Sequence, residues 1–276
     1  MYASVEHQLH IRRTSWHFGA LLLIATLVAV GCTNTGSQKD ETRSFLWTNQ
    51  SGDAETLNLN NGKIWFLLDR SGSMDSVRSD VVTGFNHFVS ELRAHPLDCR
   101  MTLILFDGFR PFDVVFSAQQ IRDISKLRPN DYVPEGQTPF YDALGRLIVR
   151  ADNRIDTRIA NGEPNEDQLV VVLTDGLENA SFRYTQWDIA NLTDDRQSEG
   201  WTFVFLGANQ DSYAEGAKIG LTGGNIQNFQ MSDQSIALAF DSVSRATTEY
   251  CSKSTVQRGT SKGNFFGGIK EAEAGS

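Results

Sequence analysis

Four continuous apolar runs occur along the chain, at residues 63–68, 100–106, 168–176 and 201–207. Runs of this length without polar alternation are typical of strands that are buried on both faces of a sheet. Between the first two runs, apolar residues recur at helical spacing from Val77 to Leu92. The hydrophobic pattern therefore predicts strands that alternate with helices.

The remaining periodic segments complete an α/β pattern. Further helices are predicted at 138–155, 184–200, 211–220 and 232–250. A strand at 111–116 follows the second run after the short connection DGFR, which is typical of a hairpin, and 226–231 reads as an edge strand. Parallel strands need helical crossovers, whereas a hairpin joins antiparallel strands. We therefore expect a doubly wound, mostly parallel six-stranded sheet, with helices on both faces and one antiparallel edge strand.

Residues 1–31 have the pattern of a signal peptide. Arg12 and Arg13 precede the apolar run Phe18–Val30, which is short for a membrane-spanning helix but suits a signal peptide. The ending LVAVGC resembles a bacterial lipoprotein signal, in which cleavage before Cys32 leaves this cysteine to carry a lipid such as palmitate. Ordinary cleavage nearby and an uncleaved anchor are the alternatives. We expect an exported, membrane-anchored lipoprotein on the periplasmic or surface side of a bacterial cell envelope.

The polarity of the chain outlines the domain boundaries. Residues 32–61 are polar with little periodicity and are predicted as a flexible tether. The domain spans 62–251, and the Gly/Ser/Lys-rich tail 252–276 is predicted to be disordered. Cys99 and Cys251 form a candidate disulfide in an oxidising compartment, with two buried free thiols as the alternative.

Composition narrows the choice of partners. The chain has 276 residues, of which 40% are apolar, so one large domain is favoured over two small ones. The net charge is −9 and no basic run occurs, which argues against nucleic acid as a partner. A cation, or a partner with a basic rim, fits this charge better.

Polar residues stand at the ends of two predicted strands and at the start of a helix. They are Asp69, Ser71, Ser73, Thr138 and Asp175. In a doubly wound sheet, ligands bind at the carboxyl ends of the strands, near the point where the winding reverses. All five side chains offer oxygen, which suits Mg²⁺, Mn²⁺ or Ca²⁺ and suits zinc or copper poorly. Two carboxylates only balance a divalent cation, so the site would accept one more negative oxygen.

The motifs DRSGSM, GQTPFYDAL and LTDG, in this order, resemble a von Willebrand factor type A domain with its metal-ion-dependent adhesion site. The resemblance covers residues 62–250. It implies that Ser71, Ser73 and Thr138 coordinate the metal through their hydroxyls, whereas Asp69 and Asp175 act mostly through bound water. It also implies that an acidic side chain of a partner fills the last position. Arg70 is expected to place a cation near the metal.

Each of these residues has a simpler interpretation. Ser71 and Ser73 could cap the following helix, Thr138 could be an N-cap, and Asp175 could be a turn residue before glycine. Other acidic residues near the same edge are assigned to hydrogen bonds in turns and helices; they are Asp107, Asp142 and Asp211. The order of the motifs at strand ends favours the metal site.

We therefore predict a non-catalytic, divalent-metal-dependent protein-binding module that captures Glu or Asp of a partner. A structural scaffold in an envelope complex is the alternative. A Mg²⁺-dependent phosphatase or hydrolase with Asp69 as nucleophile is less favoured, because no general acid is evident. His87 and His95 lie on or just after the first helix, which runs away from the site, and no GxxxxGK phosphate loop occurs.

Overall fold

The computed structural model describes residues 45–48, 54–57, 62–208 and 211–273. The predicted signal peptide and Cys32 lie outside these residues. Within the segment predicted as a tether, β1 (Phe45–Thr48) and β2 (Ala54–Leu57) pair as a two-stranded antiparallel sheet, which the polar composition did not indicate. No helix in the described ranges is both long and apolar enough to cross a bilayer.

The centre of the domain is a six-stranded sheet of order β5-β4-β3-β6-β7-β8. Its strands are β3 (Gly62–Asp69), β4 (Arg100–Phe106), β5 (Asp113–Gln120), β6 (Asp167–Thr174), β7 (Thr202–Ala208) and β8 (Ile226–Phe229). All neighbours are parallel except β4 and β5, and β5 lies at one edge. The predicted α/β class and the antiparallel edge strand are confirmed.

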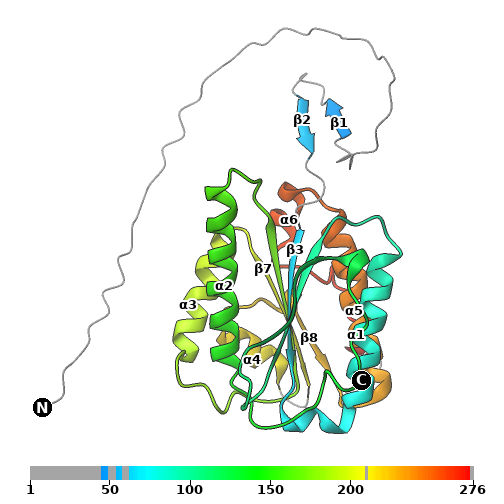
Figure 1. Cartoon of the computed structure of the whole chain (residues 1–276), viewed down its shortest axis with the longest axis vertical. Coiled ribbons are helices and arrows are strands. Elements are labelled where there is room, and N and C mark those ends of the chain that lie inside the picture. The colour runs from blue at the N-terminus through cyan, green and yellow to red at the C-terminus, as the bar shows by residue number, and fades with distance from the viewer. Residues whose placement is uncertain (1–44, 49–53, 58–61, 209–210, 274–276) are drawn as a thin grey trace, which may run out of the picture. The chain divides into compact units, whose positions relative to one another are not determined.

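Helices cover both faces of this sheet (Figure 1). One face carries α1 (Arg78–Arg93) and α5 (Asp233–Ser252), and the other carries α2 (Phe140–Ala160), α3 (Gln186–Ser198) and α4 (Ser212–Lys218). Short helices complete the chain: η1 (Gly72–Val77), η2 (Ile121–Asp123), η3 (Gly223–Asn225), α6 (Thr255–Ser261) and η4 (Glu271–Glu273). Ser232 caps α5, because its side chain accepts a hydrogen bond from the Ser235 amide.

Side chains of β3 divide between two hydrophobic cores, as the alternation along a strand requires. Phe66 lies on the α1/α5 side, where its ring packs against Phe85 and Phe240. Trp65 belongs to the core under α2. Gly84 allows α1 and α5 to approach closely, since a Cβ there would lie 2.1 Å from the ring of Phe240. The central strand is therefore buried from both sides.

The tail from Ser252 is not disordered within the described residues, so this prediction is wrong. It forms α6, and Phe265 and Phe266 are buried in the core. The buried Arg258 donates to Asp167 at 2.8 Å and to the Cys251 carbonyl at 3.0 Å. The Gly/Ser/Lys content suggested disorder, but two buried aromatic rings and an ion pair between the buried Arg258 and Asp167 of β6 order the segment.

A disulfide joins Cys99, directly before β4, to Cys251 in the last turn of α5. The two cysteines are 152 residues apart. Gly62 leaves room for the bridge, since a Cβ there would lie 2.4 Å from the sulfur of Cys99. The bridge therefore ties the end of α5 to the start of β4.

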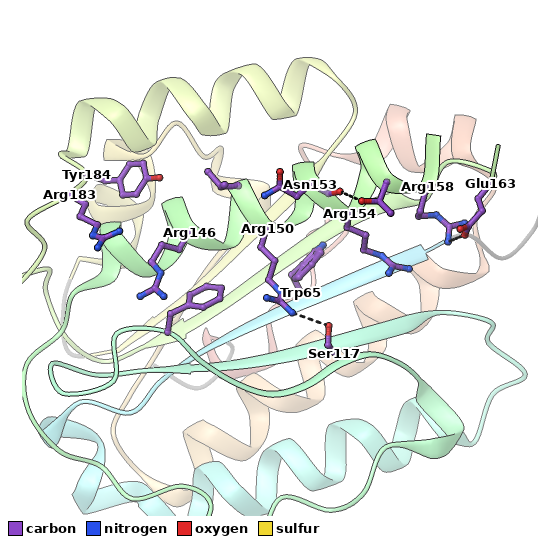
Figure 2. A pocket seen from close by; sticks show the side chains of 13 residues that line it. Trp65, Ser117, Arg146, Arg150, Asn153, Arg154, Arg158, Glu163, Arg183 and Tyr184 are labelled. Atoms are coloured by element: carbon purple, nitrogen blue, oxygen red, sulfur yellow. Dashed lines mark hydrogen bonds and ion pairs between the residues drawn. The ribbon is translucent and has the colours of Figure 1, made fainter. Parts of the chain in front are cut away.

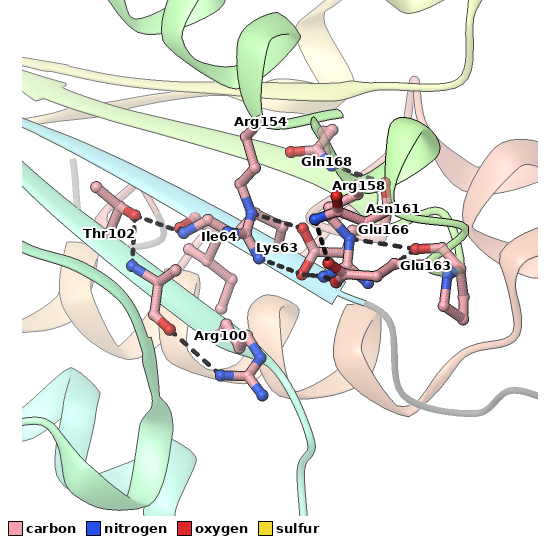
Figure 3. A network of polar contacts seen from close by, with 12 residues as sticks. Lys63, Ile64, Arg100, Thr102, Arg154, Arg158, Asn161, Glu163, Glu166 and Gln168 are labelled. Atoms are coloured by element: carbon pink, nitrogen blue, oxygen red, sulfur yellow. Dashed lines mark hydrogen bonds and ion pairs between the residues drawn. The ribbon is translucent and has the colours of Figure 1, made fainter. Parts of the chain in front are cut away.

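The face of the sheet beside α2 is open near β5, where a groove runs along the helix (Figure 2). Beneath it lies the fully buried Lys63, whose amine donates to Thr102 Oγ1 at 2.6 Å and to the Ile64 carbonyl at 3.2 Å (Figure 3). The amine also lies 4.3 Å from the ring centroid of Trp65. Burial, and then the charge of Arg154, hold the pKa of Lys63 well below its ordinary value of 10.5.

Lys63→Met should stabilise the domain near neutral pH by roughly 1–3 kcal/mol, because it removes an amine whose charged form is disfavoured by burial. Because the pKa of Lys63 is lower in the folded state, the stability of the wild type rises with pH between this lowered pKa and the ordinary value of 10.5. It falls again as the pH is lowered through the same range. The gain in melting temperature should therefore shrink as pH approaches 10.5. Thermal unfolding of both proteins across this range measures it, and a gain independent of pH would contradict the assignment.

Replacing both Cys99 and Cys251 by serine should lower the free energy of unfolding by about 2–5 kcal/mol, since the bridge closes a long loop. Urea unfolding measures the difference. Dithiothreitol should bring the wild type to the stability of the double variant and leave the variant itself unchanged. Equal stability of oxidised and reduced wild type would show that the bridge does not constrain the chain.

Candidate metal centre

Three loops meet at the carboxyl ends of β3 and β6, which are neighbours in the sheet. We call these loops the crest; they are residues 69–73, 136–138 and 175–179. The Gly72 amide donates to the Gly136 carbonyl at 3.0 Å, and the Asn179 amide donates to the Thr138 carbonyl at 3.2 Å. The chain reverses its strand order between β3 and β6, which is where doubly wound sheets bind ligands.

The two serines after β3 face the crest and do not cap the following helix. Ser71 is the N-cap residue of η1, but its side chain makes no capping hydrogen bond. Its hydroxyl lies 3.1 Å from that of Ser73, which donates to Asp175 Oδ1 at 2.8 Å. This arrangement speaks against the helix-cap interpretation of both serines.

Asp69 is a fully buried carboxylate at the end of β3. It accepts hydrogen bonds from the Ser71 amide at 2.7 Å and from the Thr174 hydroxyl. Burial raises the pKa of Asp69 to about 7, and burial also raises the pKa of Asp175. Neither carboxylate has a basic ion-pair partner among the described residues. The crest therefore holds two carboxylates whose negative charge is poorly compensated.

Thr138 is brought to the same place by the loop before α2. The N-cap residue of α2 is Pro139, so Thr138 is not the N-cap. The Thr138 amide donates to Asn179 Oδ1 at 2.9 Å, which fixes the backbone of the threonine. A Cβ at Gly176 would lie 2.9 Å from Thr138 Oγ1, so glycine is needed for this approach. The hydroxyl of Thr138 therefore lies beside the loop that carries Asp175.

The crest brings together all five side chains that the sequence singles out: Asp69, Ser71, Ser73, Thr138 and Asp175. Hydroxyl and carboxylate oxygens are the donors that Mg²⁺, Mn²⁺ and Ca²⁺ prefer, so the chemistry of the set fits such an ion. The two poorly compensated carboxylates fit it as well. In the part of the chain that the structure describes, no group of three or more His, Cys, Asp or Glu side chains could hold a metal.

Arg70 does not present a free cation at the crest, contrary to the expectation from the sequence. Its side chain is buried and forms ion pairs with Asp107 at 2.7 Å and Asp113 at 3.0 Å. Asp107 also accepts from the amides of Phe109 and Arg110. The guanidinium therefore braces the neighbouring loop against β5 and is neutralised there.

Two acidic side chains shape the loop after Asp175. Glu178 accepts from the Tyr141 amide at the start of α2 and from the Ser181 hydroxyl at 2.7 Å, a role that the sequence did not indicate. Asp142 accepts from three successive amides, those of residues 182–184, which agrees with its predicted hydrogen-bonding role. Only pairing between distant segments reveals Glu178, because no local motif marks it. Both residues hold the loop that follows β6 against α2.

Comparison with known proteins agrees with this fold. The sequence model of the von Willebrand factor type A domain matches residues 63–242. Among solved structures, the chain is similar to the pilus adhesin SpaC from Lactobacillus rhamnosus GG in an open conformation, with 14% identity, 70% of this chain and 30% of that chain covered, and a TM-score of 0.53. No curated protein matches the chain.

Two further structures are similar to this chain. A von Willebrand factor type A protein from Catenulispora acidiphila shares 18% identity over 68% of this chain and 43% of that chain, with a TM-score of 0.49. Proximal thread matrix protein 1 from the mussel byssus shares 18% identity over 67% of this chain and 47% of that chain, also with a TM-score of 0.49. This chain spans less than half the length of each of the three structures.

At these identities the solved structures show the fold alone. The family match is broader, since it runs from the start of β3 into α5 and covers more than half of the chain. The chain belongs to the von Willebrand factor type A domain family.

Proposed function

We propose that this domain is a non-catalytic, divalent-metal-dependent protein-binding module. The crest residues Asp69, Ser71, Ser73, Thr138 and Asp175 would hold Mg²⁺, Mn²⁺ or Ca²⁺. A bound ion would supply positive charge and one coordination position for a Glu or Asp side chain of a partner. The observation that carries the proposal is the pair of buried carboxylates without a basic partner, set beside three hydroxyl groups at one strand-end crest.

Exposed apolar side chains in the crest and next to it support a protein as the partner. Leu177 follows Asp175 by two residues and is 54% exposed. Phe109 is 73% exposed, and its ring lies beside Gly136 of the crest. Exposed apolar groups next to a polar anchor are typical of protein interfaces. The partner would therefore offer an acidic residue with apolar neighbours.

The proposed location is the outside of the cell membrane, with a lipid on Cys32. The signal-like pattern of residues 1–31 supports export. The Cys99–Cys251 disulfide supports it too, because such bridges persist in oxidising compartments.

Asp69→Asn should abolish Mg²⁺ binding, and Ser73→Ala should weaken it by roughly 10–100-fold, since each removes an oxygen that holds the ion in place. Ser76→Ala is the matched control, because Ser76 lies on the same short helix and is exposed. Calorimetric titration of Mg²⁺, Mn²⁺ and Ca²⁺ into the wild type and the three variants measures the affinities.

Equal affinity for Mg²⁺ in Ser73→Ala and Ser76→Ala would contradict the assignment of Ser73 as a ligand.

Thermal melts with and without EDTA distinguish a site that recruits a partner from a structural scaffold. A scaffold would lose several degrees of melting temperature on chelation, whereas a recruitment site would mainly lose partner binding.

Peptides from a random library that bind in Mg²⁺ and elute with EDTA should be enriched in Asp or Glu next to an apolar residue. Leu177→Ala should weaken their binding about fivefold or more, because truncating an apolar contact at an interface costs about 1 kcal/mol or more. Mg²⁺ affinity should stay unchanged in this variant. Enrichment without an acidic residue would argue against metal-mediated capture.

A further inference from the structure

A row of arginines runs along α2. Arg146, Arg150, Arg154 and Arg158 recur every four residues and therefore share one face of the helix. They line the groove between α2 and β5, which has a volume of about 730 Å³ (Figure 2). Arg183, from the loop after β6, joins them at one end. This surface, which we call the arginine groove, contains none of the crest ligands.

The charge of the arginine groove differs from that of the whole chain. Five arginines and one glutamate line it, although the chain carries a net charge of −9. Two of the arginines are paired, since Arg154 binds Glu166 through two hydrogen bonds of 2.8 Å and Arg158 binds Glu163 at 2.6 Å. The remaining positive charge is concentrated at the end of the groove where Arg146, Arg150 and Arg183 lie.

Three arginines of the groove have no carboxylate partner among the described residues: Arg146, Arg150 and Arg183. Arg146 lies 4.7 Å from the ring centroid of Phe112, and Arg150 reaches Ser117 Oγ at 3.5 Å. Figure 2 shows both side chains leaving the helix toward the strand side of the groove. These guanidinium groups retain hydrogen-bond donors for an external anion.

We propose that the arginine groove binds an extended acidic segment of a partner protein, with Asp or Glu at alternate positions. Arginines one turn apart on a helix are separated by about 6 Å along the axis. Side chains on one face of an extended strand recur every ~6.6 Å. The two repeats nearly match, so two carboxylates at alternate positions can meet Arg146 and Arg150, the two arginines of the row without a carboxylate partner among the described residues. Arg154 and Glu166, which are joined by two hydrogen bonds, are an example within the molecule of an arginine of this row binding a carboxylate.

A short acidic peptide fits the groove better than a long polyanion. The arginine row extends only about 18 Å along the helix, from Arg146 to Arg158, and its half at Arg154 and Arg158 is already paired with glutamates. A longer polymer would continue over a surface whose overall charge is negative, at distances where repulsion is only partly screened. Phe112 and the exposed Val149 add apolar contacts that suit the intervening side chains of a peptide.

The test uses the full chain and a synthetic peptide with glutamate at every second position. Fluorescence anisotropy measures its binding to the wild type and to the double variant Arg146→Gln with Arg150→Gln. Arg122→Gln is the matched control, because Arg122 is 76% exposed and lies outside the groove. The comparison ligands are a peptide of the same composition with its glutamates in one block, and inorganic polyphosphate.

Binding of the alternating peptide should fall roughly tenfold for each arginine removed, since each pairs with a carboxylate through charged hydrogen bonds. It should be unchanged in Arg122→Gln, weaken with added salt and survive EDTA, which separates this site from the proposed metal site. Unchanged binding in the double variant would overturn the proposal. Equal affinity for the block peptide, or binding of polyphosphate alone, would also overturn it.

Discussion

The central physical constraint in this domain is that the fully buried strand β3 ends in a carboxylate, Asp69. All eight residues of β3 are buried between two parallel neighbours and two layers of helices. Asp69 at its end is therefore removed from water, and its charge is costly unless something compensates it. Its hydrogen-bond donors are hydroxyl and amide groups, and no basic side chain of the described residues forms an ion pair with it. Burial at the end of this strand thus leaves the negative charge of the crest poorly compensated.

A frame of hydrogen bonds holds the crest loops in place. The Tyr132 hydroxyl donates to the Asp69 carbonyl, and Asn179 bonds the Thr138 backbone on both its amide and its carbonyl. Arg70 braces the adjacent loop through its ion pairs with Asp107 and Asp113. Side chains that are fixed before a ligand arrives lose little entropy on binding. The frame therefore positions the oxygens of the crest in advance.

The domain separates its charges in space. Negative charge gathers at the strand-end crest, whereas the unpaired positive charge lies along α2 beside the open part of the sheet. Part of this cationic row is neutralised from within by Glu163 and Glu166.

The sequence by itself determined the order of strands and helices, because continuous apolar runs and helical spacing are local patterns that burial imposes directly. It also singled out the oxygen-bearing side chains that meet at the crest, since Asp69, Ser71 and Ser73 follow one strand and Asp175 follows another. Only the tertiary structure decided that the tail is folded, because Arg258 pairs with Asp167 and Phe266 packs in the core. It also decided that Arg70 is neutralised and that one side of α2 remains open. These features depend on contacts between residues far apart in the chain, which no local pattern encodes.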